Sequence, residues 1–147
     1  MQTDFLVIGS GIAGLTYALK VAEECPGKTV TILTKTQSDE TNTKYAQGGI
    51  AGVMDFDHDS FQKHIDDTII AGDGLCNKHI VEIVIKEGVD RINEIIEWGA
   101  RFDKEADGDY KLGKEGGHSE SRILHHKDVT GREMERALLE AINRKPN

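Results

Sequence analysis

The first 33 residues show two short apolar runs separated by one amphipathic stretch. Residues 4–8 form a short apolar run that is followed directly by Gly9, and residues 29–33 form a run rich in β-branched side chains. Apolar runs of this length without alternation are typical of strands covered on both faces. One helical stripe of residues 14–24 holds Leu15, Ala18, Leu19 and Ala22. Two strands joined through a helix predict a parallel, right-handed βαβ unit.

The middle of the chain predicts an irregular segment followed by two helices. Residues 34–56 carry no helical stripe, so we expect an irregular loop there. A helix is expected after an N-cap at Asp59 or Ser60, with this stripe: Phe61, His64, Ile65, Thr68 and Ile69. After a break at residues 72–74, residues 79–98 predict a second helix with apolar residues at helical spacing: Ile80, Val84, Val89, Ile92 and Ile96.

The last third predicts a hairpin and a terminal helix. Residues 101–103 and 110–112 flank Asp107-Gly108, a pair that favours a hairpin turn. Thr130-Gly-Arg-Glu133 has the pattern of a capping box and predicts the start of a helix with these residues inward: Met134, Leu138, Ala141 and Ile142. The fold class is therefore α/β: a βαβ start, then helices and a β-hairpin, with an incomplete sheet because two parallel strands leave faces and edges uncovered.

Composition and charge exclude several classes of partner. Lys and Arg total 18 against 26 Asp and Glu, which gives a net charge of −8 and no clustered basic face for nucleic acid or an anionic membrane surface. No apolar stretch approaches the length of a membrane span. Cys25 and Cys76 form no CxxC motif or disulfide framework, and the sequence begins without the pattern of a signal peptide. These features favour a reduced, cytoplasmic location.

A glycine motif joins the first predicted strand to the first helix. In Gly9-Ser10-Gly11-Ile12-Ala13-Gly14 the GxGxxG spacing occurs in a strand–turn–helix context, which is typical of dinucleotide binding. Gly9 would allow the tight turn, Gly11 the approach of a pyrophosphate, and Gly14 close packing of helix on strand. The N-terminus of the helix would offer free N–H groups to the phosphates. The alternative is a glycine-rich turn without a ligand.

The second strand ends without the acidic residue that usually binds a ribose in NAD sites. Thr34 and Lys35 occupy that position, and Asp39 and Glu40 come too late in the sequence. This pattern argues against ordinary NAD binding. A threonine hydroxyl and a lysine would still suit an adenosine ribose or a phosphate.

A second glycine-containing segment runs from Asn42 to Ala51. Its paired glycines, Gly48 and Gly49, would let backbone lie flat against a large ligand, and Thr43 and Gln47 supply hydrogen-bonding groups for a heteroaromatic edge. Composition alone favours an ordinary polar loop for this segment.

Several sequence blocks together resemble the L-aspartate oxidases, a group within the succinate dehydrogenase/fumarate reductase flavoprotein family. The blocks occur in order along the whole chain: Gly9–Leu15, Thr34–Lys35, Asn42–Ala51, Asp67–Gly74, Arg101–Asp103, Glu115–Ser119, Arg122–His125 and Thr130–Glu133. The blocks from Tyr45 to Ala51 and from Glu115 to Ser119 are specific, whereas the GxGxxG motif is shared with many nucleotide-binding proteins.

The resemblance implies FAD as the cofactor, in a Rossmann-like FAD-binding domain. The residues that match the family's FAD contacts are Gly9, Ser10, Gly11, Ile12, Ala13, Gly14, Lys35, Asn42, Thr43, Lys44, Tyr45, Ala46, Gln47, Gly48 and Gly49. Membrane-bound relatives carry a histidine for covalent flavin on the stretch where this chain has Asn42. The resemblance therefore implies that FAD is held non-covalently.

The resemblance also implies a reaction and its partners. The family oxidises L-aspartate to iminoaspartate, passes electrons to oxygen or fumarate, and supplies quinolinate synthase on the route to NAD. Glu115 matches a residue proposed to orient the aspartate ammonium, although by itself it has the pattern of a solvated loop glutamate.

The resemblance places the catalytic residues outside this sequence. No catalytic residue is expected in residues 1–147, which match the N-terminal part of the FAD-binding domain. The capping and C-terminal domains and the rest of the sheet are expected in the remainder of a longer chain, so this piece should expose apolar surface, bind FAD weakly and not turn over aspartate. A polar cluster lacks the spacing of a metal site: His118, Ser119, Arg122, His125 and His126.

Two alternatives stay open from the sequence. One is a soluble fumarate reductase or succinate dehydrogenase flavoprotein, which Asn42 and Glu115 disfavour. The other is a non-catalytic nucleotide-binding fragment that kept the glycine turn without the chemistry.

Overall fold

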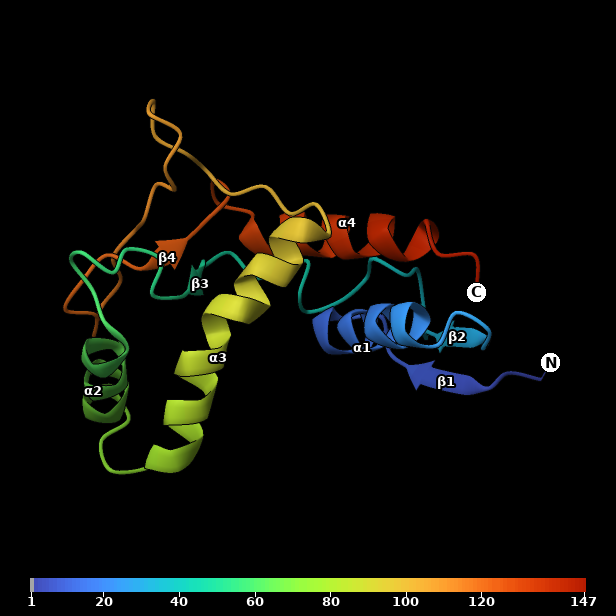
Figure 1. The fold of residues 1–147 in the computed structure, drawn as a ribbon, viewed down its shortest axis with the longest axis horizontal. Helices are drawn as coiled ribbons and strands as arrows, with labels where there is room; N and C mark the ends of the chain where they lie inside the picture. Colours follow the sequence, from blue (N-terminus) through green and yellow to red (C-terminus); the bar gives the residue numbers. More distant parts are fainter. Residues whose placement is uncertain (1) are drawn as a thin grey trace. The chain divides into compact units, whose positions relative to one another are not determined.

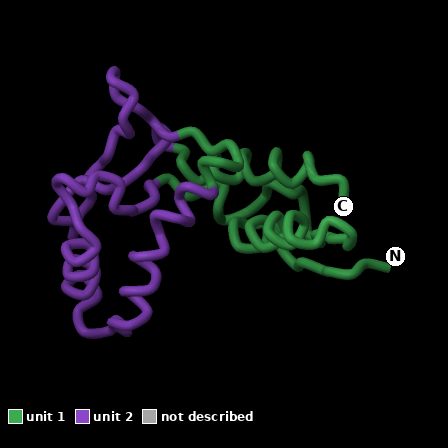
Figure 2. The backbone as a smooth tube through the Cα atoms, in the orientation of Figure 1, with its two compact units in different colours: residues 1–47, 95–101, 129–147 green, residues 48–94, 102–128 purple. Residues whose placement is uncertain are grey.

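The computed structural model describes residues 2–147 and divides into two compact units. Unit 1 consists of residues 1–47, 95–101 and 129–147, and unit 2 consists of residues 48–94 and 102–128 (Figure 2).

Unit 1 contains the predicted βαβ unit. Strands β1 (Phe5–Ile8) and β2 (Val30–Leu33) pair in parallel, with Phe5 opposite Val30 and Ile8 opposite Leu33. Helix α1 (Ile12–Glu24) connects them and buries Leu15, Ala18, Leu19 and Ala22, as the sequence predicts. The α/β fold class with an incomplete sheet is thus confirmed, with helix α1 beginning two residues earlier than expected.

Helix α4 (Thr130–Asn143) completes unit 1 by packing along α1 (Figure 1). Leu15 and Leu19 of α1 meet Leu138 and Ala141 of α4 in a buried cluster, and Trp98 packs against it. Other apolar side chains of the unit stay uncovered. Leu6 is 55% exposed, Ile8 79% and Leu33 56%, so the two-stranded sheet presents an open apolar surface, as expected for an incomplete sheet.

Unit 2 combines two helices with a short antiparallel pair. Helix α2 (Phe61–Ala71) begins at the N-cap Ser60, whose hydroxyl accepts a hydrogen bond from Lys63 N–H. Helix α3 (Lys78–Glu97) follows, and its last turn belongs to unit 1. Strands β3 (Ile50–Ala51) and β4 (Ile123–Leu124) pair antiparallel. No helix within residues 2–147 combines the length and apolar character needed to cross a membrane.

Three expectations for unit 2 are wrong or only partly right. Strand β3 lies in the segment expected to be irregular, and pairs with a strand over 70 residues away. The expected hairpin has no two regular strands: one isolated bridge joins Lys104 to Tyr110, although Gly108 does take the expected positive φ, at 99°. On α3, Ile80 and Val84 are exposed, and Ile85 and Ile95 are buried with Ile92 instead.

The capping box predicted at Thr130–Glu133 is also wrong. Helix α4 has Val129 as its N-cap, without a side-chain capping hydrogen bond. The carboxylate of Glu133 accepts hydrogen bonds from Arg101 N–H (2.9 Å) and from the guanidinium of Arg136. A tertiary partner and a charged neighbour have thus replaced the local bond that the pattern predicts.

Candidate functional site

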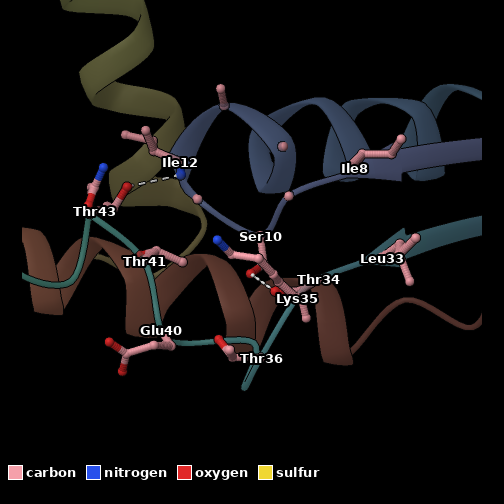
Figure 3. Close-up of a pocket in the computed structure, with 15 residues that line it drawn as sticks. Ile8, Ser10, Ile12, Leu33, Thr34, Lys35, Thr36, Glu40, Thr41 and Thr43 are labelled. Atoms are coloured by element: carbon pink, nitrogen blue, oxygen red, sulfur yellow. Dashed lines mark hydrogen bonds between the residues drawn. The ribbon is translucent and has the colours of Figure 1, made fainter.

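A cavity of about 550 Å³ lies in unit 1 where β1 and β2 end and α1 begins (Figure 3). Its walls come from the turn after β1, the segment after β2 and the start of the second glycine-containing segment. The lining residues are Ile8, Gly9, Ser10, Gly11, Ile12, Ala13, Gly14, Leu33, Thr34, Lys35, Thr36, Glu40, Thr41, Asn42 and Thr43. The structure thus brings Gly9–Gly14, Lys35, Asn42 and Thr43 of the predicted site together.

The three glycines of the turn have different physical roles. Gly9 has φ of 107°, a conformation that L side chains rarely adopt. A Cβ on Gly14 would overlap the carbonyl oxygen of Gly9, so the start of α1 packs against the turn only without a side chain. Gly11 is different, because the only atom near its hypothetical Cβ is Thr43 Oγ1, at 3.5 Å. The positive φ favours glycine at position 9 and close packing requires Gly14, whereas Gly11 keeps the cavity wall open.

The N-terminus of α1 presents hydrogen-bond donors to this cavity. Gly11 is the N-cap and provides no side-chain capping bond. The N–H of Ile12 donates to Thr43 Oγ1 (3.1 Å), while Ala13 and Gly14 precede the first intrahelical bond, which Leu15 makes to Gly11. Free N–H groups and the helix dipole favour an anion at this end. The wall therefore fits the diphosphate of a dinucleotide.

The segment after β2 adds polar groups to the same cavity. Ser10 is 3% exposed, and its hydroxyl donates to Thr34 Oγ1 (3.2 Å), so the two turns face each other across one hydrogen bond (Figure 3). Glu40 also lines the cavity. From the sequence, Glu40 comes too late to be the acidic residue that directly follows the second strand. The residue reaches the cavity wall on the later part of this segment, and its carboxylate accepts a hydrogen bond from the hydroxyl of Tyr45.

The residues after Thr43 lie elsewhere in unit 1. Lys44 pairs with Asp39 (2.8 Å), and this hydrogen bond raises the pKa of the Lys44 ammonium. The hydroxyl of Tyr45 donates to Glu40 (2.8 Å). The carbonyl of Ala46 accepts a hydrogen bond from Gly131 N–H, at the start of α4. Lys44–Gln47 do not line the cavity, and Gln47 is exposed.

The glycine pair of the second segment belongs to unit 2, where it meets Glu115. A Cβ on Gly49 would overlap Ile123 and the carbonyl oxygen of Leu124, so β4 packing explains this glycine. A Cβ on Gly48 would meet only Glu115 Oε1, at 3.7 Å. The structure therefore places the carboxylate of Glu115 directly beside the exposed backbone of Gly48.

The polar cluster predicted around Arg122 is organised by two aspartates that sequence reasoning missed. Arg122 is fully buried, and its Nε and Nη2 donate to the two carboxylate oxygens of Asp59 (2.8 Å each). Its Nη1 donates to Asp67 Oδ2 (2.6 Å). Burial alone would raise the pKa of Asp67, but hydrogen bonds from Ser119 and Arg122 outweigh it and lower that pKa to about 2. From the sequence, Asp67 was only the first residue of one block of the family resemblance, and Asp59 was only a candidate N-cap.

The histidines of the cluster make contacts but no metal site. His118 packs edge-to-face against His64, with ring centroids 5.9 Å apart. His64, a member of the predicted stripe of this helix, is buried, and burial and the neighbouring Arg122 lower its pKa. His125 and His126 lie near Asp103. Within residues 2–147 no group of three or more potential ligands is arranged to hold a metal ion.

Comparison with known proteins agrees with this geometry. The sequence profile of the FAD binding domain family matches residues 4–146. The chain belongs to this family. FAD as the expected cofactor is therefore confirmed, and the glycine-walled cavity at the start of α1 fits its diphosphate.

Curated relatives support the same assignment. L-aspartate oxidase 2-b, chloroplastic, of Nicotiana tabacum is 53% identical over 144 residues, covering 98% of this chain and 22% of that protein. L-aspartate oxidase of Yersinia pestis is 46% identical over 149 residues, covering 99% of this chain and 27% of that protein. The chain thus spans about a quarter of the length of these relatives, and its resemblance to the L-aspartate oxidases is confirmed.

A solved structure shares the fold. The E. coli quinol fumarate reductase FrdA superposes with a TM-score of 0.92 at 29% identity, covering 99% of this chain and 25% of that one. The chain therefore shares its fold with part of this fumarate reductase chain.

Proposed function

We propose that this chain is the N-terminal part of the FAD-binding domain of an L-aspartate oxidase, which oxidises L-aspartate to iminoaspartate. The observation that carries the proposal is the position of Glu115, whose carboxylate lies beside the bare backbone of Gly48. A carboxylate at that place would attract the ammonium of an amino acid and discriminate it from a plain dicarboxylate. The similarity to L-aspartate oxidases over nearly the whole chain supports the same substrate.

The residues around the cavity would hold the cofactor. The N–H groups at the start of α1 and the bare backbone of Gly11 would bind the diphosphate, and Lys35 would add positive charge beside it. The backbone from Asn42 to Gly49 would run along the isoalloxazine. When bound, FAD takes up the hydride equivalent removed from the α-carbon of the substrate.

The attachment of FAD follows from the side chain at position 42. Asn42 lines the cavity, and its side-chain amide is too weak a nucleophile to form a covalent bond to a flavin. FAD would therefore be bound non-covalently. We further propose oxygen or fumarate as the electron acceptor and the supply of quinolinate synthase, in NAD biosynthesis, as the role of the product.

The coverage of the relatives bears on domain organisation. Since this chain spans about a quarter of each relative, we propose that capping and C-terminal domains lie in the remainder of a longer polypeptide. The groups that bind the substrate carboxylates and transfer the proton would lie there too. A cytoplasmic location stays a prediction, and the tobacco relative is named as chloroplastic.

Spectroscopy of the full-length protein that contains this chain tests the proposal. We expect a yellow protein whose colour is released into the supernatant by acid precipitation, because the flavin is not covalently bound. Under nitrogen, L-aspartate should bleach the flavin absorbance and succinate should not. Bleaching by succinate alone would refute the proposed substrate, and colour that stays in the precipitate would refute non-covalent binding.

A soluble fumarate reductase is the second candidate. The close superposition on quinol fumarate reductase favours it, because the two chains share one backbone arrangement. Glu115 argues against it, since a carboxylate beside the substrate would repel a dicarboxylate that carries no compensating ammonium. The same bleaching experiment separates the two candidates.

A further inference from the structure

The loop that carries Glu115 is closed at its base by backbone hydrogen bonds. The N–H of Gly113 donates to the carbonyl of Ile123 (2.9 Å), and the N–H groups of Arg122 and Ile123 both donate to the carbonyl of Gly113 (3.0 Å each). At the tip, His118 N–H donates to the carbonyl of Glu115 (3.2 Å). The base and the tip of the loop, residues 113–123, are therefore defined locally.

Asp67 of α2 ties the side of this loop to the helix. Its Oδ2 accepts hydrogen bonds from Ser119 N–H (2.7 Å), from Ser119 Oγ (2.8 Å) and from Arg122 Nη1 (2.6 Å). Charge-assisted hydrogen bonds of this length are strong and directional. A single carboxylate oxygen thus connects the residue after the tip with the residue before the base.

Arg122 extends this connection to the start of α2. Its two bonds to Asp59 and one to Asp67 use the planar fork of the guanidinium, and its side chain is fully buried. A buried guanidinium that is paired with two carboxylates has little freedom to move, because any other position leaves a charge unpaired. Helix α2 and the loop are therefore held as one group, within unit 2.

The consequence of anchoring residues 113–123 is that the position of the loop tip is fixed within unit 2. The tip bears Glu115, whose Oε1 lies 3.7 Å from the position of a Cβ on Gly48, while the residue itself is exposed and forms no ion pair with the other residues of 2–147. The Glu115 side chain is therefore not held by partners of its own. Its place depends on the backbone that Asp67 and Arg122 anchor.

We propose that Asp67 and Arg122 are positioning residues for Glu115, and that through it they set the preference of the enzyme for an amino acid over a plain dicarboxylate. This inference rests on the proposed function, in which Glu115 faces the substrate ammonium. The attraction between two charges falls with distance, so a displaced loop weakens it. A displacement of about 1 Å costs on the order of 100-fold in rate where a reacting geometry is involved.

The test uses the full-length, FAD-loaded protein with three single variants and one double variant. Asp67→Asn keeps the size of the side chain and removes its charge toward Arg122. Ser119→Ala removes one hydrogen bond to Asp67 and leaves the backbone bond, so it is the milder variant and serves if Asp67→Asn does not fold. Glu115→Gln is the reference, alone and combined with Asp67→Asn.

The matched control is Asp66→Asn. Asp66 is the neighbouring carboxylate on α2, is exposed, and accepts a hydrogen bond from Gln62 only on the helix surface (2.8 Å). It does not touch the loop in the described contacts of residues 2–147. We expect this variant to retain the wild-type kcat/KM for L-aspartate and the wild-type rate of fumarate reduction.

The readout is kcat/KM for L-aspartate oxidation compared with that for fumarate reduction by the reduced enzyme. We expect Asp67→Asn to lower the first by about 10- to 100-fold and the second by less than about 3-fold, with a smaller selective loss for Ser119→Ala. In the background of Glu115→Gln, the Asp67→Asn change should have no further selective effect, because its target is already lost.

Other results would overturn the inference. An equal fall for both reactions indicates a purely structural role, and a full additional loss in the double variant indicates an action that does not pass through Glu115. Unchanged selectivity in both Asp67→Asn and Ser119→Ala would show that these contacts do not position Glu115. A wild-type enzyme that does not oxidise L-aspartate refutes the proposed function itself, and this is known before any variant is measured.

Discussion

Gly131, in the first turn of α4, lies against the carbonyl oxygen of Thr43 so closely that there is no room for a Cβ. Its N–H donates to the carbonyl of Ala46 (3.0 Å), one turn further along the same segment. The start of α4 therefore packs directly against the backbone of residues 43–46. This close packing is possible only because Gly131 has no side chain.

Replacing this glycine should destabilise unit 1. In Gly131→Ala the methyl group would overlap two backbone carbonyls, which cannot move as a flexible side chain would, so we expect a loss of about 1–3 kcal/mol in the free energy of unfolding. Urea unfolding of the full-length protein, followed by far-UV circular dichroism, measures the change.

Gly88→Ala is the matched control, because both sites are glycines within helices. No atom lies within 4 Å of a Cβ on Gly88, in α3. Alanine there should stabilise the protein by about 0.5–1 kcal/mol, through its higher helix propensity. Equal effects of the two substitutions would show that Gly131 has no special packing role.

Local patterns were sufficient for the elements whose contacts are local. The runs that became β1 and β2 and the stripe of α1 could be recognised because a buried parallel strand and an amphipathic helix each leave a signature within a few residues. Strand β3 has no such local signature. It has two residues and pairs with β4 across the sequence, so periodicity had nothing to detect.

The residues of the candidate site also differ in whether a local pattern could predict them. Gly9 and Gly14 could be predicted because a tight turn and a close approach each require glycine within one short motif. The pairing of Arg122 with Asp59 and Asp67 could not be predicted, because these residues are 63 and 55 positions apart. Nothing in the local sequence distinguishes these aspartates from others as partners of a buried arginine. Glu133 failed as a capping residue for the related reason that a distant N–H, that of Arg101, binds it.

The two glycines of the first turn should respond differently to alanine. Gly14→Ala would place a methyl group on the carbonyl of Gly9 and should lower stability with or without FAD. Gly11→Ala meets only Thr43 Oγ1, at an ordinary contact distance, so stability without FAD should be unchanged. Its methyl group would occupy the cavity wall and weaken FAD binding by about 10-fold or more, on the scale of one lost close contact.

Flavin fluorescence titration of the apoprotein and urea unfolding without FAD distinguish these effects. Tight FAD binding by Gly11→Ala would show that the cofactor does not approach this turn. Gly27→Ala serves as a control, since a Cβ at Gly27 has open space around it and Gly27 lies outside the cavity.

The buried group around Arg122 should make the protein sensitive to acid. The pKa of Asp67 is lowered from 3.8 to about 2, so its ionised form stabilises the fold at neutral pH. This contribution is complete above pH 3.8 and is lost as the pH falls toward 2, and it amounts to about 2 kcal/mol at neutral pH. Asp67→Asn should therefore lower stability at neutral pH and flatten the dependence below pH 3.8.

Unfolding midpoints measured in urea across this acidic range check the prediction. Asp66→Asn is again the control, because this exposed carboxylate lies one residue away and outside the buried group. If both variants lose stability with the same pH profile as the wild type, Asp67 is not the source of the acid sensitivity.

The pH dependence of stability that Glu135 contributes should have the opposite sign to that of Asp67. Its side chain is buried in α4 with only 2% of the residue exposed, and neither carboxylate oxygen has a hydrogen-bond partner within residues 2–147. Burial raises its pKa above the ordinary 4.5. A carboxyl with a raised pKa stabilises the fold while it is protonated, and that stabilisation is lost as the pH rises through the folded value. Ionisation of Glu135 therefore costs stability, because its charge is poorly solvated in the fold.

Glu135→Gln removes that charge while keeping the shape of the side chain. We expect a higher urea midpoint than the wild type at about pH 8 and little difference at about pH 4, where the glutamate is already protonated. Glu140→Gln on the same helix is the control: its side chain is 59% exposed and forms a surface pair with Arg136, so it should change stability by less than about 1 kcal/mol. A midpoint for Glu135→Gln that falls at about pH 8 would mean that the ionised carboxylate has a favourable partner and that burial does not dominate its pKa.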